Sequence, residues 1–182
     1  MARVRRRELL ASVAAATTTA AGCSGLGESL TGEDIREAEP VTVETIDAPG
    51  SEAGRATVPE PGRVTFVEFF ATTCGICASQ MSAVGEAHRE VPDGVQFLSV
   101  TSEPVGLSIS TEAVASWWAD HGGTWTVAAD DGTALARRYG ATSVPRAVVV
   151  APDGTETWSH AGRTTAARIV DEIRAADGGE SS

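Results

Sequence analysis

An apolar run that leads into two closely spaced cysteines constrains the fold of this chain more than any other feature. Residues 64–70 are rich in β-branched and aromatic side chains, which is typical of a buried strand. Residues 78–91 carry apolar side chains at helical spacing, so we expect a helix there. Cys74 and Cys77 lie between the two segments, and this order places Cys74 at a turn from strand to helix.

The position of Cys74 predicts a reactive sulfur. At a helix N-terminus the helix dipole and the free N–H groups stabilise a thiolate, which lowers the pKa of the thiol below ~8.5. Cys77 follows one helical turn later and can reach Cys74 to form a disulfide. An attacking thiol and a resolving thiol together form a two-electron redox couple. The spacing therefore favours redox chemistry.

Two other interpretations of the pair are half of a zinc site and an inert structural disulfide. A zinc site needs a second set of Cys or His ligands at close spacing. The remaining cysteine is Cys23, and the histidines His88, His121 and His160 are scattered along the chain. The tight spacing at a helix start disfavours an inert disulfide. We therefore expect no metal site here.

Charge limits the partners and indicates the environment of the protein. All 14 basic residues of the 182-residue chain are arginines, against 25 acidic residues, and the formal net charge is −11. Because phosphate binding requires a basic surface, this balance argues against nucleic acid as a partner. A lysine-free acidic surface resembles that of proteins from salt-loving microbes, in which salt screens the self-repulsion. The alternative is an ordinary acidic protein encoded by GC-rich DNA.

Residues 1–22 have the order of features expected of an export signal. Four arginines precede a short, mildly apolar segment, which is too short and too polar to span a bilayer. Arg6-Arg7 resembles the twin-arginine pattern, which directs the export of folded proteins. Residues 20–23, Ala-Ala-Gly-Cys, resemble a lipobox, so we expect cleavage before Cys23 and lipidation of that cysteine. The alternatives are an uncleaved signal anchor and ordinary secretion with a free Cys23.

The rest of the chain divides into a tether, one domain and a tail. Residues 23–40 combine the lipidated cysteine with an acidic stretch rich in Gly and Ser, which we interpret as a flexible tether. Residues 41–176 are long enough for one domain with its own core. Residues 177–182 are expected to be a disordered tail.

Within the domain, the pattern predicts an α/β fold. The buried strand, the cysteine helix and a second buried strand at 95–100 form a β–α–β unit, which implies parallel pairing. A proline at the start of a later strand, with a turn after it, suits an antiparallel pair. The remaining expected elements are a hairpin of 41–46 with 55–58, helices 112–120, 133–139 and 165–175, and strands 125–129, 146–150 and 155–160.

Two stretches of the chain resemble the thioredoxin superfamily, in particular the TlpA/ResA-like membrane-anchored thiol-disulfide oxidoreductases. They are residues 69–77, Phe-Phe-Ala-Thr-Thr-Cys-Gly-Ile-Cys, and residues 139–145, Tyr-Gly-Ala-Thr-Ser-Val-Pro, followed by a strand and Pro-Asp-Gly. The resemblance covers residues 41–176. It implies a thioredoxin-like fold, with a central mixed sheet flanked by helices and extended by the N-terminal hairpin. It also implies an oxidoreductase that needs no cofactor besides the Cys74–Cys77 disulfide.

The resemblance assigns roles to individual residues. Pro145 matches the family's cis-proline, which lies beside the active disulfide and, with Val144, offers backbone groups to an extended substrate. The alternative for Pro145 is an ordinary trans proline. Glu68 stands where thioredoxins carry a buried acid, and such a carboxyl could relay a proton to or from Cys77. The alternation of residues along the strand leaves open which face Glu68 takes, and the alternative is a position facing solvent.

Three positions depart from the family pattern. Thr73 replaces the usual Trp before the first cysteine, at a position that shapes the substrate-binding surface. Gly75-Ile76 replaces the Pro-containing dipeptides, so the reduction potential does not follow from the resemblance. Gln80 replaces a frequent Glu and cannot titrate, which leaves acid–base chemistry to Glu68 or to water.

The resemblance and the export signal together predict a lipid-anchored, monomeric enzyme on the outer face of the cytoplasmic membrane of a halophilic archaeon. Its expected partners are disulfides or thiols of exported proteins, such as apocytochromes c or copper sites of respiratory oxidases, and a membrane electron donor. One rival is a Sco-like copper carrier, which would need a CxxxC spacing and a distal histidine. The other is a peroxiredoxin, whose Thr-x-x-Cys pattern fails because Ala71 precedes Cys74 by three residues.

Overall fold

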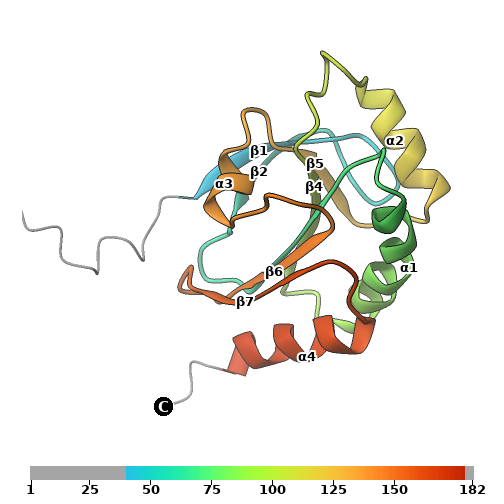
Figure 1. Cartoon of the computed structure of the whole chain (residues 1–182). Coiled ribbons are helices and arrows are strands. Elements are labelled where there is room, and N and C mark those ends of the chain that lie inside the picture. The colour runs from blue at the N-terminus through green and yellow to red at the C-terminus, as the bar shows by residue number, and fades with distance from the viewer. Residues whose placement is uncertain (1–39, 179–182) are drawn as a thin grey trace, which may run out of the picture. The chain divides into compact units, whose positions relative to one another are not determined.

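The computed structural model describes residues 40–178, which form one mixed sheet with helices on both of its faces (Figure 1). The predicted α/β fold, with a mixed sheet flanked by helices and extended by the N-terminal hairpin, is confirmed. In chain order the elements are β1 (Val41–Thr45), β2 (Gly54–Val58), β3 (Thr65–Phe70), α1 (Gly75–Glu90), β4 (Gln96–Thr101), α2 (Thr111–Asp120), β5 (Thr126–Ala129), α3 (Ala134–Arg138), β6 (Arg146–Val150), β7 (Glu156–Ala161) and α4 (Ala166–Asp177).

The seven strands lie in the order β2-β1-β5-β4-β3-β6-β7. Strands β3, β4 and β5 are parallel, as the β–α–β pattern predicts. The β1–β2 hairpin is antiparallel and joins the sheet through β1, where Glu44 pairs with Ala129 of β5. On the other side β3 pairs with β6 and β6 with β7, both antiparallel. Strand β3 therefore lies inside the sheet, between β4 and β6, and the segment that follows it lies at the carboxyl end of the parallel strands.

Every residue of β3 is buried because both faces of the sheet are covered. Phe66 and Phe70 pack in one cluster with residues of α1 and α4, which lie on the same side of the sheet (Figure 1). Val67 and Phe69 pack in a second cluster, against α3. This arrangement explains why the run at 64–70 is apolar throughout rather than alternating.

The helices begin where side chains cap them. Helix α1 begins at Gly75, earlier than the expected start at 78, because Cys74 itself takes the N-cap position. Ser110 caps α2, with its Oγ accepting from the backbone N–H of Ala113 at 3.2 Å. Thr165 caps α4, which runs to Asp177, two residues past the expected end.

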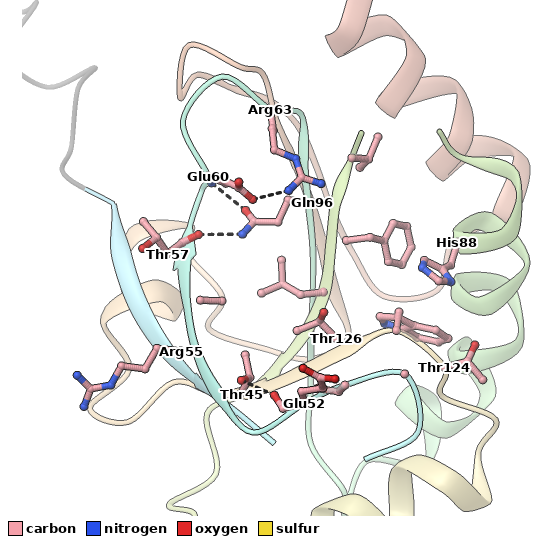
Figure 2. A pocket seen from close by; sticks show the side chains of 17 residues that line it. Thr45, Glu52, Arg55, Thr57, Glu60, Arg63, His88, Gln96, Thr124 and Thr126 are labelled. Carbon is pink, nitrogen blue, oxygen red and sulfur yellow. Dashed lines mark hydrogen bonds and ion pairs between the residues drawn. The ribbon is translucent and has the colours of Figure 1, made fainter. Parts of the chain in front are cut away.

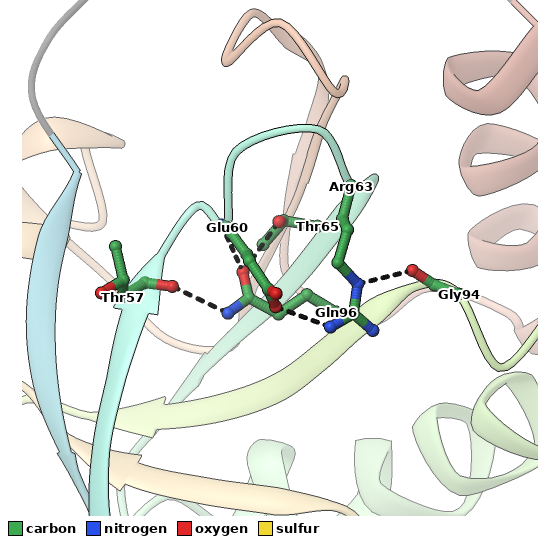
Figure 3. A network of polar contacts seen from close by, with 6 residues as sticks. All are labelled: Thr57, Glu60, Arg63, Thr65, Gly94 and Gln96. Atoms are coloured by element: carbon green, nitrogen blue, oxygen red, sulfur yellow. Dashed lines mark hydrogen bonds and ion pairs between the residues drawn. The ribbon is translucent and has the colours of Figure 1, made fainter.

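A polar network joins the strands at the end of the sheet opposite the cysteines (Figure 3). The Oε1 of Gln96, at the start of β4, accepts from the backbone N–H of Glu60 and from the Thr65 hydroxyl, both at 2.8 Å. Its Nε2 donates to the carbonyl of Thr57 at 2.8 Å. Arg63 pairs with Glu60 and donates to the Gly94 carbonyl at 2.8 Å. The network fixes the connection from β2 to β3 against the start of β4.

Several expectations fall outside the described residues. The export signal at 1–22, Cys23 with most of the tether, and residues 179–182 of the tail belong to this group. Among residues 40–178, the helices are all too short or too polar to cross a membrane.

Candidate active site

Cys74 and Cys77 form a disulfide at the N-terminus of α1, as the sequence predicts. The Cys74 Sγ accepts a hydrogen bond from the backbone N–H of Cys77 at 3.1 Å, and the Cys74 carbonyl accepts from Ala78 at 3.1 Å. This position exposes the first sulfur to the free N–H groups and the positive end of the helix dipole, which together favour a thiolate after reduction.

The two sulfurs differ in exposure. The Cys74 side chain is half-buried, whereas Cys77 is 2% exposed and packs in the core with Met81 and Val84. Thr73, which precedes Cys74, is exposed. Ile76, which lies between the two cysteines, is 57% exposed. A partner protein can therefore approach Cys74 but not Cys77, which matches the roles of attacking and resolving thiol.

The Val144–Pro145 peptide bond is cis, and it lies beside the disulfide. The Cys74 Sγ is 3.8 Å from the carbonyl oxygen of Val144. The Pro145 carbonyl accepts from the backbone N–H of Gly162 at 2.8 Å. This hydrogen bond holds the cis-proline segment against the connection between β7 and α4. The structure thus brings Cys74 next to Val144 and Pro145, although Cys74 and Val144 are 70 residues apart in sequence.

Glu68 is buried in the centre of β3 and is 3% exposed. It is aligned with Ser99 of β4 and Ala147 of β6. Because side chains alternate along a strand, Glu68 shares the face of Phe66 and Phe70, which is the face that α1 covers. This placement resolves the question left open by the sequence and excludes a position facing solvent. Burial raises the pKa of Glu68 from 4.5 to about 8, so the carboxyl keeps its proton at neutral pH.

Glu103, which sequence reasoning did not single out, holds the turn before the first cysteine. Its carboxylate accepts from the backbone N–H of Thr72 at 2.8 Å and from the Thr72 hydroxyl at 2.9 Å. It also accepts from the Thr101 hydroxyl at 3.0 Å. An acid that directly follows a buried strand of a parallel sheet lies at the same edge as the ends of the other parallel strands. This position in the sequence is the signal from which Glu103 can be predicted as part of the site.

Gln80 lies on the buried face of α1, three residues after Cys77. It is 1% exposed, and its Oε1 accepts from the backbone N–H of Thr164 at 3.0 Å. Its Nε2 is buried and has no hydrogen-bond partner among the described residues.

The position usually held by Trp in the resembling family is Thr73 here, but Trp117 of α2 stacks on Phe70 at 5.1 Å between ring centroids. An indole therefore packs against Phe70, the last residue of β3 before the turn that leads to Cys74.

The three histidines lie in separate places. His88 packs beside Phe97 and Trp125, where burial lowers its pKa, and His121 stacks on Trp117. His160 contacts the carbonyl of Arg163. Within residues 40–178, the structure contains no group of three His, Cys, Asp or Glu side chains that could hold a metal ion.

A hollow of about 750 Å³ lies at the opposite end of the parallel strands, between the β1–β2 hairpin and α1 (Figure 2). Gln96 and Arg63 line one part of it and His88 another. The two arginines that line it are each paired with a carboxylate, Arg63 with Glu60 and Arg55 with Glu44. The hollow is remote from the disulfide, so we do not include it in the active site.

Comparisons with known proteins give one matching family and a set of similar folds. The profile of the family described as Redoxin matches residues 40–175. None of the curated protein sequences matches the chain. StoA from Bacillus subtilis has a similar structure, with a TM-score of 0.61, 16% identity, and coverage of 73% of this chain and 95% of that one.

Two further solved structures are similar. The pneumococcal exposed lipoprotein thioredoxin Etrx1 from Streptococcus pneumoniae has a TM-score of 0.61, 20% identity, and coverage of 75% of this chain and 98% of that one. A protein described as a thiol:disulfide interchange protein DsbE, from Chlorobium tepidum, has a TM-score of 0.58, 21% identity, and coverage of 76% and 97%. At these identities the similarity establishes the fold.

Proposed function

The chain belongs to the Redoxin family and is a thioredoxin-like thiol-disulfide oxidoreductase, and from this premise we propose that it reduces disulfides of exported proteins at the outer face of the cytoplasmic membrane. The observation that carries the proposal is the half-buried Cys74 sulfur at the start of α1, 3.8 Å from the Val144 carbonyl. An extended partner segment that pairs with this backbone has its own sulfur within reach of Cys74.

In the proposed reaction the Cys74 thiolate attacks one sulfur of a partner disulfide. The partner's S–S bond breaks, a Cys74–partner mixed disulfide forms, and the other partner sulfur leaves as a thiolate. Cys77 then loses its proton and attacks the Cys74 sulfur, which releases the second partner thiolate. Two electrons pass to the partner, and the enzyme is left with the Cys74–Cys77 disulfide. A membrane electron donor would restore the dithiol.

Glu68 is the proposed proton relay for Cys77. Its carboxyl lies on the face of β3 that packs against α1, the helix that carries Cys77. With a pKa of about 8, it can both accept and release a proton near neutral pH. Gln80 cannot take this role because an amide does not titrate.

The trapping experiment tests the assignment of the two cysteines. Cys77→Ser leaves the attacking thiol without a resolving thiol, so the mixed disulfide with the partner should accumulate in cells. Cys74→Ser should trap nothing. Accumulation in Cys74→Ser instead would reverse the two roles. Identification of the trapped proteins tests whether they are apocytochromes c, copper-site proteins or others.

The equilibrium reduction potential of the pair tests the direction of electron flow. A value near or below roughly −250 mV, in the thioredoxin range, supports reduction of exported proteins. A value near roughly −120 mV, in the DsbA range, would make the protein an oxidant that installs disulfides. The absence of a reversible two-electron couple would refute the redox function and favour a copper carrier, which copper titration of the reduced protein would detect.

The membrane location rests on the sequence of the first 23 residues. We propose export by the twin-arginine route and a lipid anchor at Cys23, on a monomeric protein. Cys23→Ala should release the protein from membranes to the medium, and Arg6→Lys with Arg7→Lys should retain it unexported. A membrane-bound Cys23→Ala protein would refute the lipid anchor.

A further inference from the structure

Gln80 lies on the buried face of α1, three residues after Cys77. Residues three apart on a helix are neighbours on its surface. Side chains of a helix also lean toward its N-terminus, over the preceding turn. We therefore expect the Gln80 amide to lie near the turn that carries Cys77.

A hydrogen bond from a distant segment fixes the orientation of this amide. The Oε1 of Gln80 accepts from the backbone N–H of Thr164, which is 84 residues away in sequence. Thr164 belongs to the β7–α4 connection, whose Gly162 donates to the Pro145 carbonyl. With its oxygen committed to this connection, the amide keeps its Nε2 available as a donor.

The Nε2 group is a buried donor without a partner among the described residues. Leaving a buried donor unpaired costs about 1–3 kcal/mol, so such groups are rare in native proteins and call for an explanation. The two sulfurs of the disulfide differ in the hydrogen bonds that they accept. The Cys74 Sγ accepts from the N–H of Cys77, whereas the buried Cys77 sulfur has no donor among the described hydrogen bonds.

We propose that the Nε2–H of Gln80 donates to the Cys77 sulfur once the disulfide is opened, and so stabilises the reduced pair. The inference deepens the proposed function and rests on the Cys74–Cys77 redox couple. Reduction adds two electrons from a dithiol and breaks the S–S bond, and the dithiol becomes a disulfide. Cys77 is then a thiol in the reduced protein, whose sulfur accepts a hydrogen bond, and a thiolate while it resolves a mixed disulfide. A thiolate is an anion and a far better hydrogen-bond acceptor than a sulfur in a disulfide.

The titratable groups around Cys77 are few. Cys74 lies at the helix start, and Glu68 faces the same layer from β3. In the β7–α4 region, His160 and Arg163 are exposed. Glu68 can donate to sulfur only while it keeps its proton, whereas the Gln80 amide is a donor at every pH.

The test uses the whole chain with Cys23→Ser, so that the pair supplies all of the thiols, and measures the equilibrium with dithiothreitol. Gln80→Met keeps the length of the side chain but has neither donor nor acceptor. We expect it to shift the equilibrium about tenfold toward the disulfide, which is about 30 mV for a two-electron couple. Gln96→Met is the matched control, because Gln96 is also tied to the backbone but at the far end of the sheet. Its equilibrium should not change.

Gln80→Glu separates the donor from the acceptor. Glutamate still accepts from Thr164, but it donates only while protonated. We expect this variant to match the unsubstituted chain at low pH and to approach Gln80→Met as the pH rises. It also covers the case in which Gln80→Met fails to fold, because the bond to Thr164 is kept.

Two results would overturn the inference. One is an unchanged equilibrium in Gln80→Met together with a lower Tm, which would make Gln80 purely structural. The other is a Gln80→Glu equilibrium that tracks the unsubstituted chain at every pH. Because dithiothreitol is the reductant, the shift is measurable without any protein partner. A shift in a protein that reduces no exported substrate would therefore refute the proposed function and uphold this inference.

Discussion

The two ends of the parallel strands use glutamine in opposite ways. At the amino end, Gln96 has hydrogen-bond partners for both its oxygen and its nitrogen (Figure 3). At the carboxyl end, Gln80 is more deeply buried, yet within residues 40–178 only its oxygen has a partner. A fully paired amide stabilises the fold, whereas a buried donor without a partner destabilises it unless another state of the protein uses the donor. The comparison separates the part of the molecule that maintains the fold from the part that carries the chemistry.

Removal of the attacking thiol should have the largest effect on thiol–disulfide exchange and only a small effect on stability. We expect Cys74→Ser to abolish thiol–disulfide exchange, because the remaining Cys77 is buried away from partners. The loss of a disulfide that closes so short a loop should reduce stability by only about 2 kcal/mol. Exchange kinetics with a protein disulfide and urea unfolding measure the two effects. Cys23→Ser is the control and should retain full exchange activity; exchange by Cys74→Ser at the rate of this control would contradict the assignment.

Glu68 should destabilise the native state as the pH rises, since burial raises its pKa from 4.5 to about 8. Between these values the unfolded chain has lost the proton that the native protein keeps, so stability falls as the pH increases. Glu68→Gln removes this ionisation. It should therefore raise the free energy of unfolding by about 4 kcal/mol more at pH 8 than at pH 4.

Urea unfolding across this pH range measures the effect, and the same variant should exchange more slowly if Glu68 relays the proton of Cys77. Glu86→Gln, at an exposed position on α1, is the control. An equal effect of Glu68→Gln at both pH values would show that the carboxyl is ionised in the native protein.

Gln96→Met should lower the free energy of unfolding by about 2–3 kcal/mol, because the Glu60 N–H, the Thr65 hydroxyl and the Thr57 carbonyl lose their shared partner. Exchange with protein disulfides should not change. Thermal unfolding and exchange kinetics test both statements. A slower exchange in this variant would mean that the two ends of the sheet are coupled and that the amino end also contributes to the chemistry.

Glu103→Gln should have the smallest effect on stability. Glu103 lies at the disulfide end of the sheet, but among the described residues its side chain, unlike that of Gln80, is fully hydrogen bonded. Replacing one carboxylate oxygen by an amide removes one good acceptor from Thr72 or Thr101, which should cost about 1 kcal/mol of stability. Exchange should slow because the turn before Cys74 is held less firmly. Urea unfolding and the exchange rate check this, and an unchanged exchange rate would make Glu103 a structural residue alone.

Much of the fold and part of the site could be predicted because the signals are local. The apolar run of β3, the turn residues and the helix caps each act within a few residues, and the expected strands and helices follow from them. The Cys74–Cys77 disulfide at a helix start also depends only on spacing within one turn. The start of α1 was placed too late because a cysteine is not a usual N-cap residue.

The sequence alone determined the α/β order of elements, the reactive cysteine pair and the acid inside an apolar strand. The tertiary structure decided the rest, since each remaining feature joins segments far apart in the chain. The face of Glu68 depends on the cover of helices on both sides of β3, because a strand buried on both faces has no alternation to read. Likewise, the pairing of Gln80 with Thr164, of Glu103 with Thr72 and of Cys74 with Val144 is set by packing across the sheet. Hydrogen bonds between distant segments leave no periodic pattern, so only the folded chain reveals them.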